Sequence, residues 1–257
     1  MKRRSLWLWA AAVLAYVFLY APLVIVVVYS FNDSRLNAQW VGFTLDWYRK
    51  LFADEEMLTA ARNSLVIGLV ASIVSTALGT MAGYAMYRYK LRLLPILVVA
   101  PIAIPEILMG VSLLIFFVGI NLTLGLISIT FAHIAFCIGF VAIVVRSRLA
   151  GMDESLVEAA RDLGATPWGA FRLITLPLIM PGVIAGALMA FTLSIDDFVV
   201  TYFTAGADAL TLPLKIYTMV KISVTPEVNA VSTLLMLLTL ALIVVASRLA
   251  PGALRGR

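Results

Sequence analysis

The chain has 257 residues, of which 63% are hydrophobic and 13% are charged, and its formal net charge is +5. Soluble domains contain about 25% charged residues, so this composition excludes an ordinary soluble domain. The apolar residues form continuous blocks long enough to cross a bilayer as helices, and they do not alternate as barrel strands do. The sequence therefore predicts an all-α, multi-pass membrane protein. The single cysteine, Cys137, excludes an internal disulfide bond and a cysteine metal cluster, and its apolar surroundings indicate packing.

We expect six transmembrane helices within one transmembrane domain that covers residues 1–257. The predicted spans are residues 6–29, 64–86, 94–119, 123–145, 181–203 and 228–247. The first span follows Lys2, Arg3 and Arg4, as the apolar part of a signal peptide would. Its apolar run is longer than the roughly 7–15 residues of a cleaved signal, so we predict that it stays in the protein.

Lysine and arginine residues are distributed unequally between the two sides of the predicted helices. Most of the 19 lie on the side that carries both termini and the connection 146–180. These residues are Lys2, Arg3, Arg4, Arg88, Lys90, Arg92, Arg146, Arg148, Arg161, Arg172, Arg248, Arg255 and Arg257. Because positive residues concentrate on the cytoplasmic side, we expect both termini and the connection 146–180 to be cytoplasmic. This placement accounts for the positive charge without a nucleic-acid partner.

The connection 30–63, on the opposite side, is rich in aromatic residues. They are Trp40, Phe43, Trp47, Tyr48 and Phe52. Their spacing fits an amphipathic helix that lies at the membrane interface. A docking site for a partner protein is the alternative for the same residues.

The third predicted span contains two prolines and an acid. Pro101 and Pro105 are four residues apart, and Glu106 follows directly. Proline kinks or breaks a helix, and broken helices with freed backbone groups often line transport sites. An acid at mid-bilayer costs about 2.5–3.5 kcal/mol, so Glu106 is expected to face a cavity or, alternatively, to satisfy a helix N-terminus. In the fourth span, a neutral, hydrogen-bonded packing role is expected for His133 in preference to a proton relay.

The connection 146–180 has the pattern of two short helices joined by a turn. Asp153 can cap the first helix, and Gly164 can end it in the left-handed conformation. Thr166 can then cap a second helix with Pro167 at its first position, where the missing N–H costs nothing. A polar helical hairpin between apolar spans cannot lie in lipid. We therefore expect it to sit on the membrane face and to dock onto another protein.

The fifth predicted span, residues 181–203, contains two adjacent acids, Asp196 and Asp197. Neighbouring residues on a helix diverge by about 100°, so at most one of them points squarely into a pathway. Phe198 and Tyr202 follow at positions where their rings could attract a cation. A structural role, in which the acids satisfy a helix N-terminus or a Ser or Thr partner, remains the alternative.

The hairpin resembles the EAA loop of bacterial permeases of the binding-protein-dependent, type I ABC importer family. The pattern E-A-A-x3-G-x9-I-x-L-P is matched at every fixed position. The matching residues are Glu158, Ala159, Ala160, Gly164, Ile174, Leu176 and Pro177. The resemblance implies a six-helix permease fold in the bacterial inner membrane, and a loop that couples the spans to a cytoplasmic ATPase by inserting into a groove on it.

The same resemblance implies the partners. They would be a homologous second permease, a dimer of ATP-binding subunits and a periplasmic substrate-binding protein, assembled in the lipid bilayer. The chain has no glycine-rich phosphate-binding motif, so ATP and Mg²⁺ are expected on the partner ATPase. We expect no cofactor, no metal site and no catalytic residue in this chain.

Three further segments narrow the resemblance to the spermidine/putrescine transporter permeases. They are residues 194–198, 212–221 and 226–230. A polyamine substrate is therefore expected, with Glu106, Asp196, Asp197, Phe198 and Tyr202 along its pathway.

Other functions are also compatible with parts of the sequence. A permease of the same superfamily for an opine, iron, sulfate or a phosphate ester is one alternative, although anions would sit badly against Asp196 and Asp197. A proton-coupled secondary carrier would use the acids but has no use for the coupling loop. A structural membrane scaffold leaves the acids unexplained.

Overall fold

The computed structural model describes residues 2–34, 39–89, 92–207, 209–223 and 225–249, and these are almost entirely helical. Among them, five helices are long and apolar enough to cross a membrane, or six if one sharply bent pair counts as a span. This agrees with the predicted all-helical, multi-pass fold. Lys90, Arg255 and Arg257, on which the predicted orientation partly rests, lie outside the described residues, and the orientation stays a prediction.

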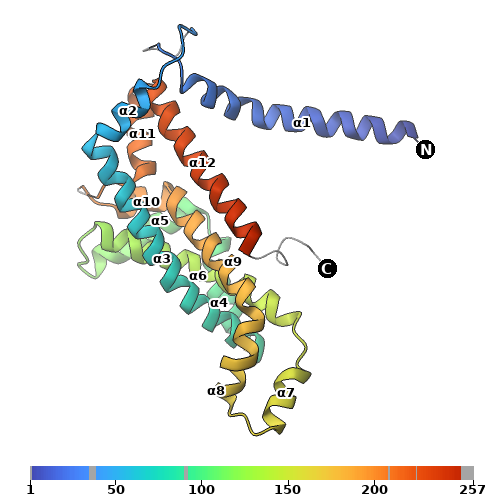
Figure 1. The fold of residues 1–257 in the computed structure, drawn as a ribbon. Helices are drawn as coiled ribbons and strands as arrows, with labels where there is room; N and C mark the ends of the chain where they lie inside the picture. Colours follow the sequence, from blue (N-terminus) through green and yellow to red (C-terminus); the bar gives the residue numbers. More distant parts are fainter. Residues whose placement is uncertain (1, 35–38, 90–91, 208, 224, 250–257) are drawn as a thin grey trace. The chain divides into compact units, whose positions relative to one another are not determined.

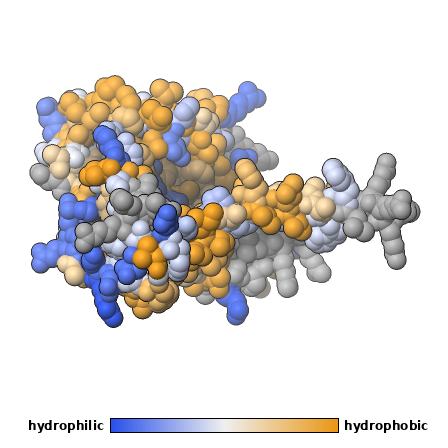
Figure 2. All heavy atoms as spheres, turned by 90° about the horizontal axis from the view of Figure 1, so that it is seen from above, coloured by the Kyte–Doolittle hydropathy of each residue, from blue (hydrophilic) through white to orange (hydrophobic). Residues whose placement is uncertain are grey.

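The long helices overlap the predicted spans. They are α1 (Lys2–Tyr29), α3 (Glu55–Arg88), α6 (Leu126–Ala150), α9 (Leu176–Asp196) and α12 (Pro226–Leu249). However, α3 begins at Glu55 rather than at residue 64, and α9 runs from Leu176 to Asp196 rather than over 181–203. Apolar side chains cover much of the surface that Figure 2 shows, and large apolar side chains are exposed along α1 from Trp7 to Val28. Exposed apolar side chains on spanning helices are expected, because lipid rather than water surrounds them.

The third predicted span is two helices that meet at 107°. They are α4 (Leu93–Ala103) and α5 (Glu106–Gly119). The break lies at Ile104, which is extended with φ −80° and ψ 132° because a residue before proline is pushed out of the helical region. Pro105 then precedes the first residue of α5, Glu106. The proline pattern thus predicted the break, and residues 94–119 form a bent pair of helices rather than one straight helix.

The fifth predicted span is also broken. The helix α9 ends at Asp196, Asp197 is extended with ψ 123°, and a short helix, α10 (Val199–Thr204), follows. No proline or glycine lies at this break. Asp197 instead accepts hydrogen bonds from the first turn of α10, as described below, so the break coincides with a helix N-terminus.

The chain divides into two compact units, and α3 and α12 contribute residues to both. The first unit comprises Met1–Leu58 and Lys215–Leu238. It holds α1, α2 (Asp46–Ala53) and most of α11 (Leu212–Ile222). An ion pair between Lys215 and Glu56 joins its two chain segments.

The aromatic connection of this unit is only partly helical. Trp47, Tyr48 and Phe52 lie on α2, so the prediction of a helix is right for them. It is wrong for Trp40 and Phe43, which precede α2. Phe43 instead pairs with Asn32 in an isolated bridge and stacks on Phe31 at 5.3 Å, and Trp47 Nε1 donates to the Asn32 carbonyl at 2.8 Å.

The second unit comprises Thr59–Leu214 and Thr239–Arg257, and α6 lies at its centre. The helices α4, α9 and α10 pack against α6, and α5 packs against α10 (Figure 1). Glycine permits the close approach of α3: a Cβ at Gly79 would lie 2.6 Å from Val141 Cβ, and one at Gly83 would lie 2.7 Å from the Ala142 carbonyl oxygen. Small residues four apart are a common device for packing membrane helices. Both candidate functional sites described in the next subsection lie within this unit.

Candidate functional site

The hairpin after α6 begins with the helix α7 (Ser155–Asp162). As the sequence predicted, Asp153 caps it: the backbone N–H of Ser155 donates to Asp153 Oδ1 at 3.0 Å. Hydrogen bonds from Ser155 hold the pKa of Asp153 below its ordinary value, because they favour the ionised carboxylate. The cap therefore contributes at neutral pH and is lost only when acid protonates the carboxylate.

The turn at Gly164 has the geometry of a Schellman motif. Gly164 has φ +91°, in the left-handed region that the sequence predicted for it. The Ala165 N–H donates to the Ala160 carbonyl at 3.0 Å, and the Gly164 N–H donates to the Arg161 carbonyl at 2.9 Å. These two bonds satisfy carbonyl groups that the end of α7 would otherwise leave unpaired.

The second helix of the hairpin begins as predicted but does not end within the loop. Thr166 Oγ1 accepts from the Gly169 N–H at 3.1 Å, and Pro167 occupies the first helical position. The helix α8 (Pro167–Ala170) continues through a wider π-turn, η1 (Phe171–Thr175), directly into α9. Pro177 would clash with the carbonyl four residues earlier in a regular helix, and the π-turn lies where it relieves that clash.

The predicted coupling residues therefore fall into two groups. Glu158, Ala159 and Ala160 lie on α7, and Gly164 lies in the turn. Ile174, Leu176 and Pro177 lie instead at the start of the long helix that ends at Asp196. The predicted loop end at residue 180 is thus too late, because Pro167–Asp196 is one continuous candidate span. The hairpin is therefore continuous with the helix that ends at Asp196.

The hairpin exposes large apolar side chains. Leu163 is 90% exposed, Leu173 is 71% exposed and Trp168 is 68% exposed. Leu163 lies in the turn, Trp168 on α8 and Leu173 in η1, so each part of the second half of the hairpin exposes a large apolar side chain.

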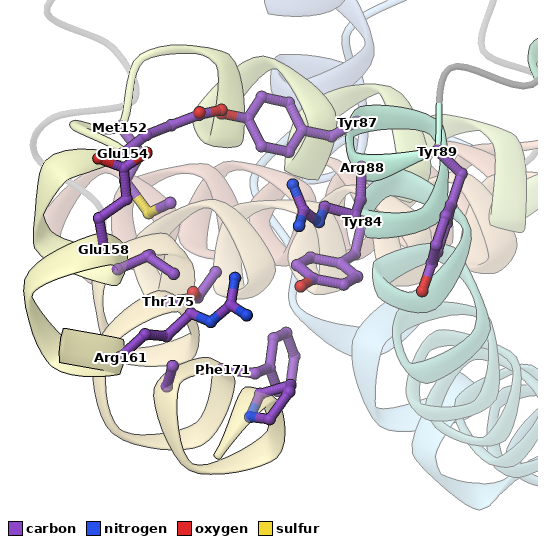
Figure 3. A pocket seen from close by; sticks show the side chains of 13 residues that line it. Tyr84, Tyr87, Arg88, Tyr89, Met152, Glu154, Glu158, Arg161, Phe171 and Thr175 are labelled. Carbon is purple, nitrogen blue, oxygen red and sulfur yellow. The ribbon is translucent and has the colours of Figure 1, made fainter. Parts of the chain in front are cut away.

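Aromatic and hydrogen-bond contacts join the hairpin to the end of α3. Figure 3 shows a cavity of about 360 Å³ between these two segments. The Tyr87 hydroxyl donates to Glu154. The rings of Tyr84 and Phe171 form an edge-to-face pair with their centroids 5.0 Å apart. Trp168 in turn stacks on Phe171 at 5.5 Å. The hairpin thus packs against the end of α3 and is continuous with α9.

The sequence reasoning missed these aromatic residues. Tyr84 and Tyr87 lie four and one residues before Arg88, at the end of a predicted span. Aromatic residues next to a positive residue mark a membrane interface. That signal could have identified the end of α3 as a boundary, but only the fold brings it against Phe171.

A second cavity, of about 350 Å³, lies where the two broken helices meet; we call it the acidic cavity. It is lined by Pro101, Ile102, Ile104, Glu106, Met109, Phe136, Phe140, Leu193, Asp196, Asp197, Phe198, Val199 and Val200. All three predicted pathway acids therefore face one cavity, from α5 and from the end of α9. Tyr202 does not line it, but its ring lies 5.7 Å from that of Phe198.

The three acids differ in their surroundings. Glu106 and Asp196 are exposed, whereas the Asp197 side chain is only 8% exposed. Asp197 Oδ2 accepts from the backbone N–H and the hydroxyl of Thr201, each at 2.8 Å. Asp197 thus caps the N-terminus of α10, which is the structural alternative that the sequence left open. Among the described residues, no group of three His, Cys, Asp or Glu side chains could hold a metal ion.

Comparison with known proteins shows the family of the chain. Residues 75–251 match the family described as "Binding-protein-dependent transport system inner membrane component". The chain is 42% identical over 244 residues to the spermidine/putrescine transport system permease protein PotC of Escherichia coli K12. The matched region covers 94% of this chain and 92% of that protein. It is 41% identical over 243 residues to the putrescine transport system permease protein PotI of the same strain, covering 91% and 86% of the two chains.

Two solved structures share the fold. One is a bacterial ABC transporter involved in the import of the acidic polysaccharide alginate, with a TM-score of 0.72 and 18% identity over 97% of this chain and 96% of that one. The other is the inward-facing methionine transporter MetNI, with a TM-score of 0.63 and 22% identity over 79% of this chain and 100% of that one. At these identities the comparison shows the fold and not the substrate.

Proposed function

Because the chain belongs to the family of binding-protein-dependent transport system inner membrane components, we propose that it is the permease subunit of an ATP-driven polyamine importer. The observation that carries the proposal is the pair of accessible carboxylates, Glu106 and Asp196, that face one cavity from two broken helices. The names of the two relatives described above, which both refer to putrescine transport, support the choice of substrate.

The chemistry of the acidic cavity suits a polyamine. A polyamine carries ammonium groups on methylene spacers, so it needs separated negative charges with apolar surfaces between them. Glu106 and Asp196 supply the charges, and Met109, Phe136 and Leu193 supply apolar walls. Phe198 can add cation–π attraction. The contacts must stay weak enough for release, so we assign high-affinity capture to a separate periplasmic binding protein.

Asp197 has a different role in this proposal. Its oxygens are engaged by α10, and contact with the cation falls to Glu106 and Asp196. Asp197 instead holds the helix break in which Asp196 and Phe198 lie. Tyr202 acts through its contact with Phe198.

The hairpin provides the connection to ATP hydrolysis. Glu158, Ala159 and Ala160 would enter a groove on the ATPase, where the small alanine side chains permit close approach. ATP binding would close the ATPase pair and open the spans outward, and hydrolysis would reset them. This chain would work with a second permease and two ATPase subunits. It would itself catalyse nothing, since ATP and Mg²⁺ would be held by the ATPase.

A competition experiment tests the substrate class. Uptake of labelled putrescine by cells that express the complete complex should be reduced by excess spermidine or unlabelled putrescine. Sulfate, phosphate esters and opines, which carry negative charges, should not compete, because the cavity offers carboxylates and no positive charge among its lining residues. Iron is a cation, but among the described residues no group of three His, Cys, Asp or Glu side chains could hold a metal ion, so iron should not compete either. Competition by an anion at comparable concentration, with no effect of amines, would show that the substrate assignment is wrong.

A further inference from the structure

One buried histidine contacts three helices beside the acidic cavity. His133 lies on α6, and its side chain is 2% exposed. Its Nδ1 lies 2.6 Å from Ser194 Oγ on α9, and its Nε2 lies 2.9 Å from Thr201 Oγ1 on α10. The same Nε2 lies 3.3 Å from Asp197 Oδ2, in the break between α9 and α10. A single imidazole ring therefore contacts both sides of the break and the acid within it.

We infer that His133 is a positioning residue of the transport pathway, which fixes the α9–α10 break and thereby directs Asp196 and Phe198 into the acidic cavity. This inference rests on the proposed transport function. It assigns to His133 a role beyond the packing role that the sequence predicted, because its contacts hold a break in the helix that lines the cavity rather than a regular helix pair.

The hydrogen bonds around His133 form one consistent chain. With its proton on Nε2, the ring accepts at Nδ1 from the Ser194 hydroxyl and donates at Nε2 to Thr201 Oγ1. The Thr201 hydroxyl then donates to Asp197 Oδ2 at 2.8 Å. Every polar group in this chain has a partner, as buried polar groups require. Loss of the ring would remove the hydrogen-bond partner of the Ser194 and Thr201 hydroxyls. The Asp197 carboxylate would then be held less firmly in the break.

Asp197 itself makes the break by capping α10, and the hydrogen-bond chain holds the Asp197 carboxylate in place. Neither proline nor glycine interrupts residues 190–200. Asp197 replaces the missing helical bonds by accepting from the backbone N–H groups of Val200 at 3.4 Å and Thr201 at 2.8 Å. If Asp197 moves, Asp196 and Phe198 on either side of it must move as well. The expected consequence is poorer transport, with the distant coupling hairpin unaffected.

A double-mutant cycle in the complete complex tests the inference. His133→Phe keeps a ring that can pack on Phe136, whose centroid lies 5.4 Å from that of His133, but removes the hydrogen bonds. We expect it to lower putrescine uptake per ATP hydrolysed by about tenfold, because hydrogen bonds to a buried charged group are among the stronger ones. His133→Gln, which keeps a donor and an acceptor, should restore uptake per ATP to within about threefold of the unchanged complex.

The cycle separates positioning from general damage. His133→Phe combined with Asp197→Asn should be little worse than either change alone, because both break the same chain. His133→Phe combined with Glu106→Gln should instead multiply the two losses, since Glu106 lies on α5, outside both the hydrogen-bond chain and the break. Wild-type uptake per ATP in His133→Phe, or independent effects of His133→Phe and Asp197→Asn, would overturn the inference.

Two smaller substitutions cover the case in which His133→Phe does not assemble. Ser194→Ala and Thr201→Val each remove one hydroxyl from the chain, and we expect each to lower uptake per ATP in the assembled complex. Unchanged values in both would overturn the inference. If the unchanged complex itself fails to carry putrescine, the proposed function is wrong, which is a distinguishable result.

Discussion

Substitution of Gly164 by valine is expected to uncouple ATP hydrolysis from uptake. Gly164 has φ +91°, and a β-branched residue in the left-handed region costs at least about 1–2 kcal/mol. A Cβ at this position would have no atom within 4 Å, so the effect comes from the backbone and not from a clash. The turn should open and displace α7 from α8. We expect uptake to fall about tenfold or more while ATP hydrolysis continues, because about 1.4 kcal/mol corresponds to a factor of ten.

The same substitution at Gly151 is a matched control. Gly151 lies at the end of α6 with φ −94°, and an added Cβ would come no closer than 3.7 Å to the Arg148 carbonyl oxygen. Gly151→Val should therefore leave both activities close to those of the unchanged complex. Gly164→Asn should be milder than Gly164→Val, because asparagine tolerates the left-handed conformation. Normal uptake by an assembled Gly164→Val complex would refute the coupling assignment.

Neutralising the two accessible acids should have the largest effect on the pathway itself. Glu106→Gln together with Asp196→Asn removes both charges that face the acidic cavity from α5 and α9. We expect polyamine uptake to fall about 100-fold, since each charged contact contributes on the order of 1.5–3 kcal/mol. Assembly with the ATPase should persist, because both side chains are exposed and neither belongs to the hairpin.

Two other acids sharpen this experiment. Asp46→Asn removes a charge from an exposed acid on α2 that pairs only locally, with Arg49 at 3.0 Å, and should leave uptake unchanged. Asp197→Asn should instead lower the thermal stability of the complex, because that carboxylate caps α10 and is nearly buried. If the Glu106→Gln and Asp196→Asn pair transports normally, the exposed acids have no part in the pathway.

Local sequence signals predicted the hairpin well. The cap at Asp153, the left-handed Gly164 and the Thr166-Pro167 start all depend on residues within one or two turns of helix. The break between α4 and α5 was predictable for the same reason, because Pro101 and Pro105 act on their immediate neighbours. Such features can be read from a sequence because their causes are contiguous in it.

Features with long-range causes were not predictable. Asp197 offered a local signal for a helix N-terminus, but the sequence did not show that His133, more than 60 residues away, contacts the two helices and Asp197 at that break. Sequence also could not distinguish Asp196 from Asp197, although one is exposed and the other is nearly buried. The attachment of Phe171 to Tyr84 likewise exists only once α3 and the hairpin are brought together.

Reconstitution of the complete complex in proteoliposomes tests the central claim most directly. The complex, with its ATPase and binding protein, is supplied with labelled putrescine under two conditions. One contains ATP, and the other has a proton gradient and no ATP. If this chain is a polyamine permease coupled to an ATPase, putrescine accumulates with ATP and the binding protein, and Gly164→Val abolishes that accumulation. Accumulation driven by the proton gradient without ATP, or none with ATP, would contradict it.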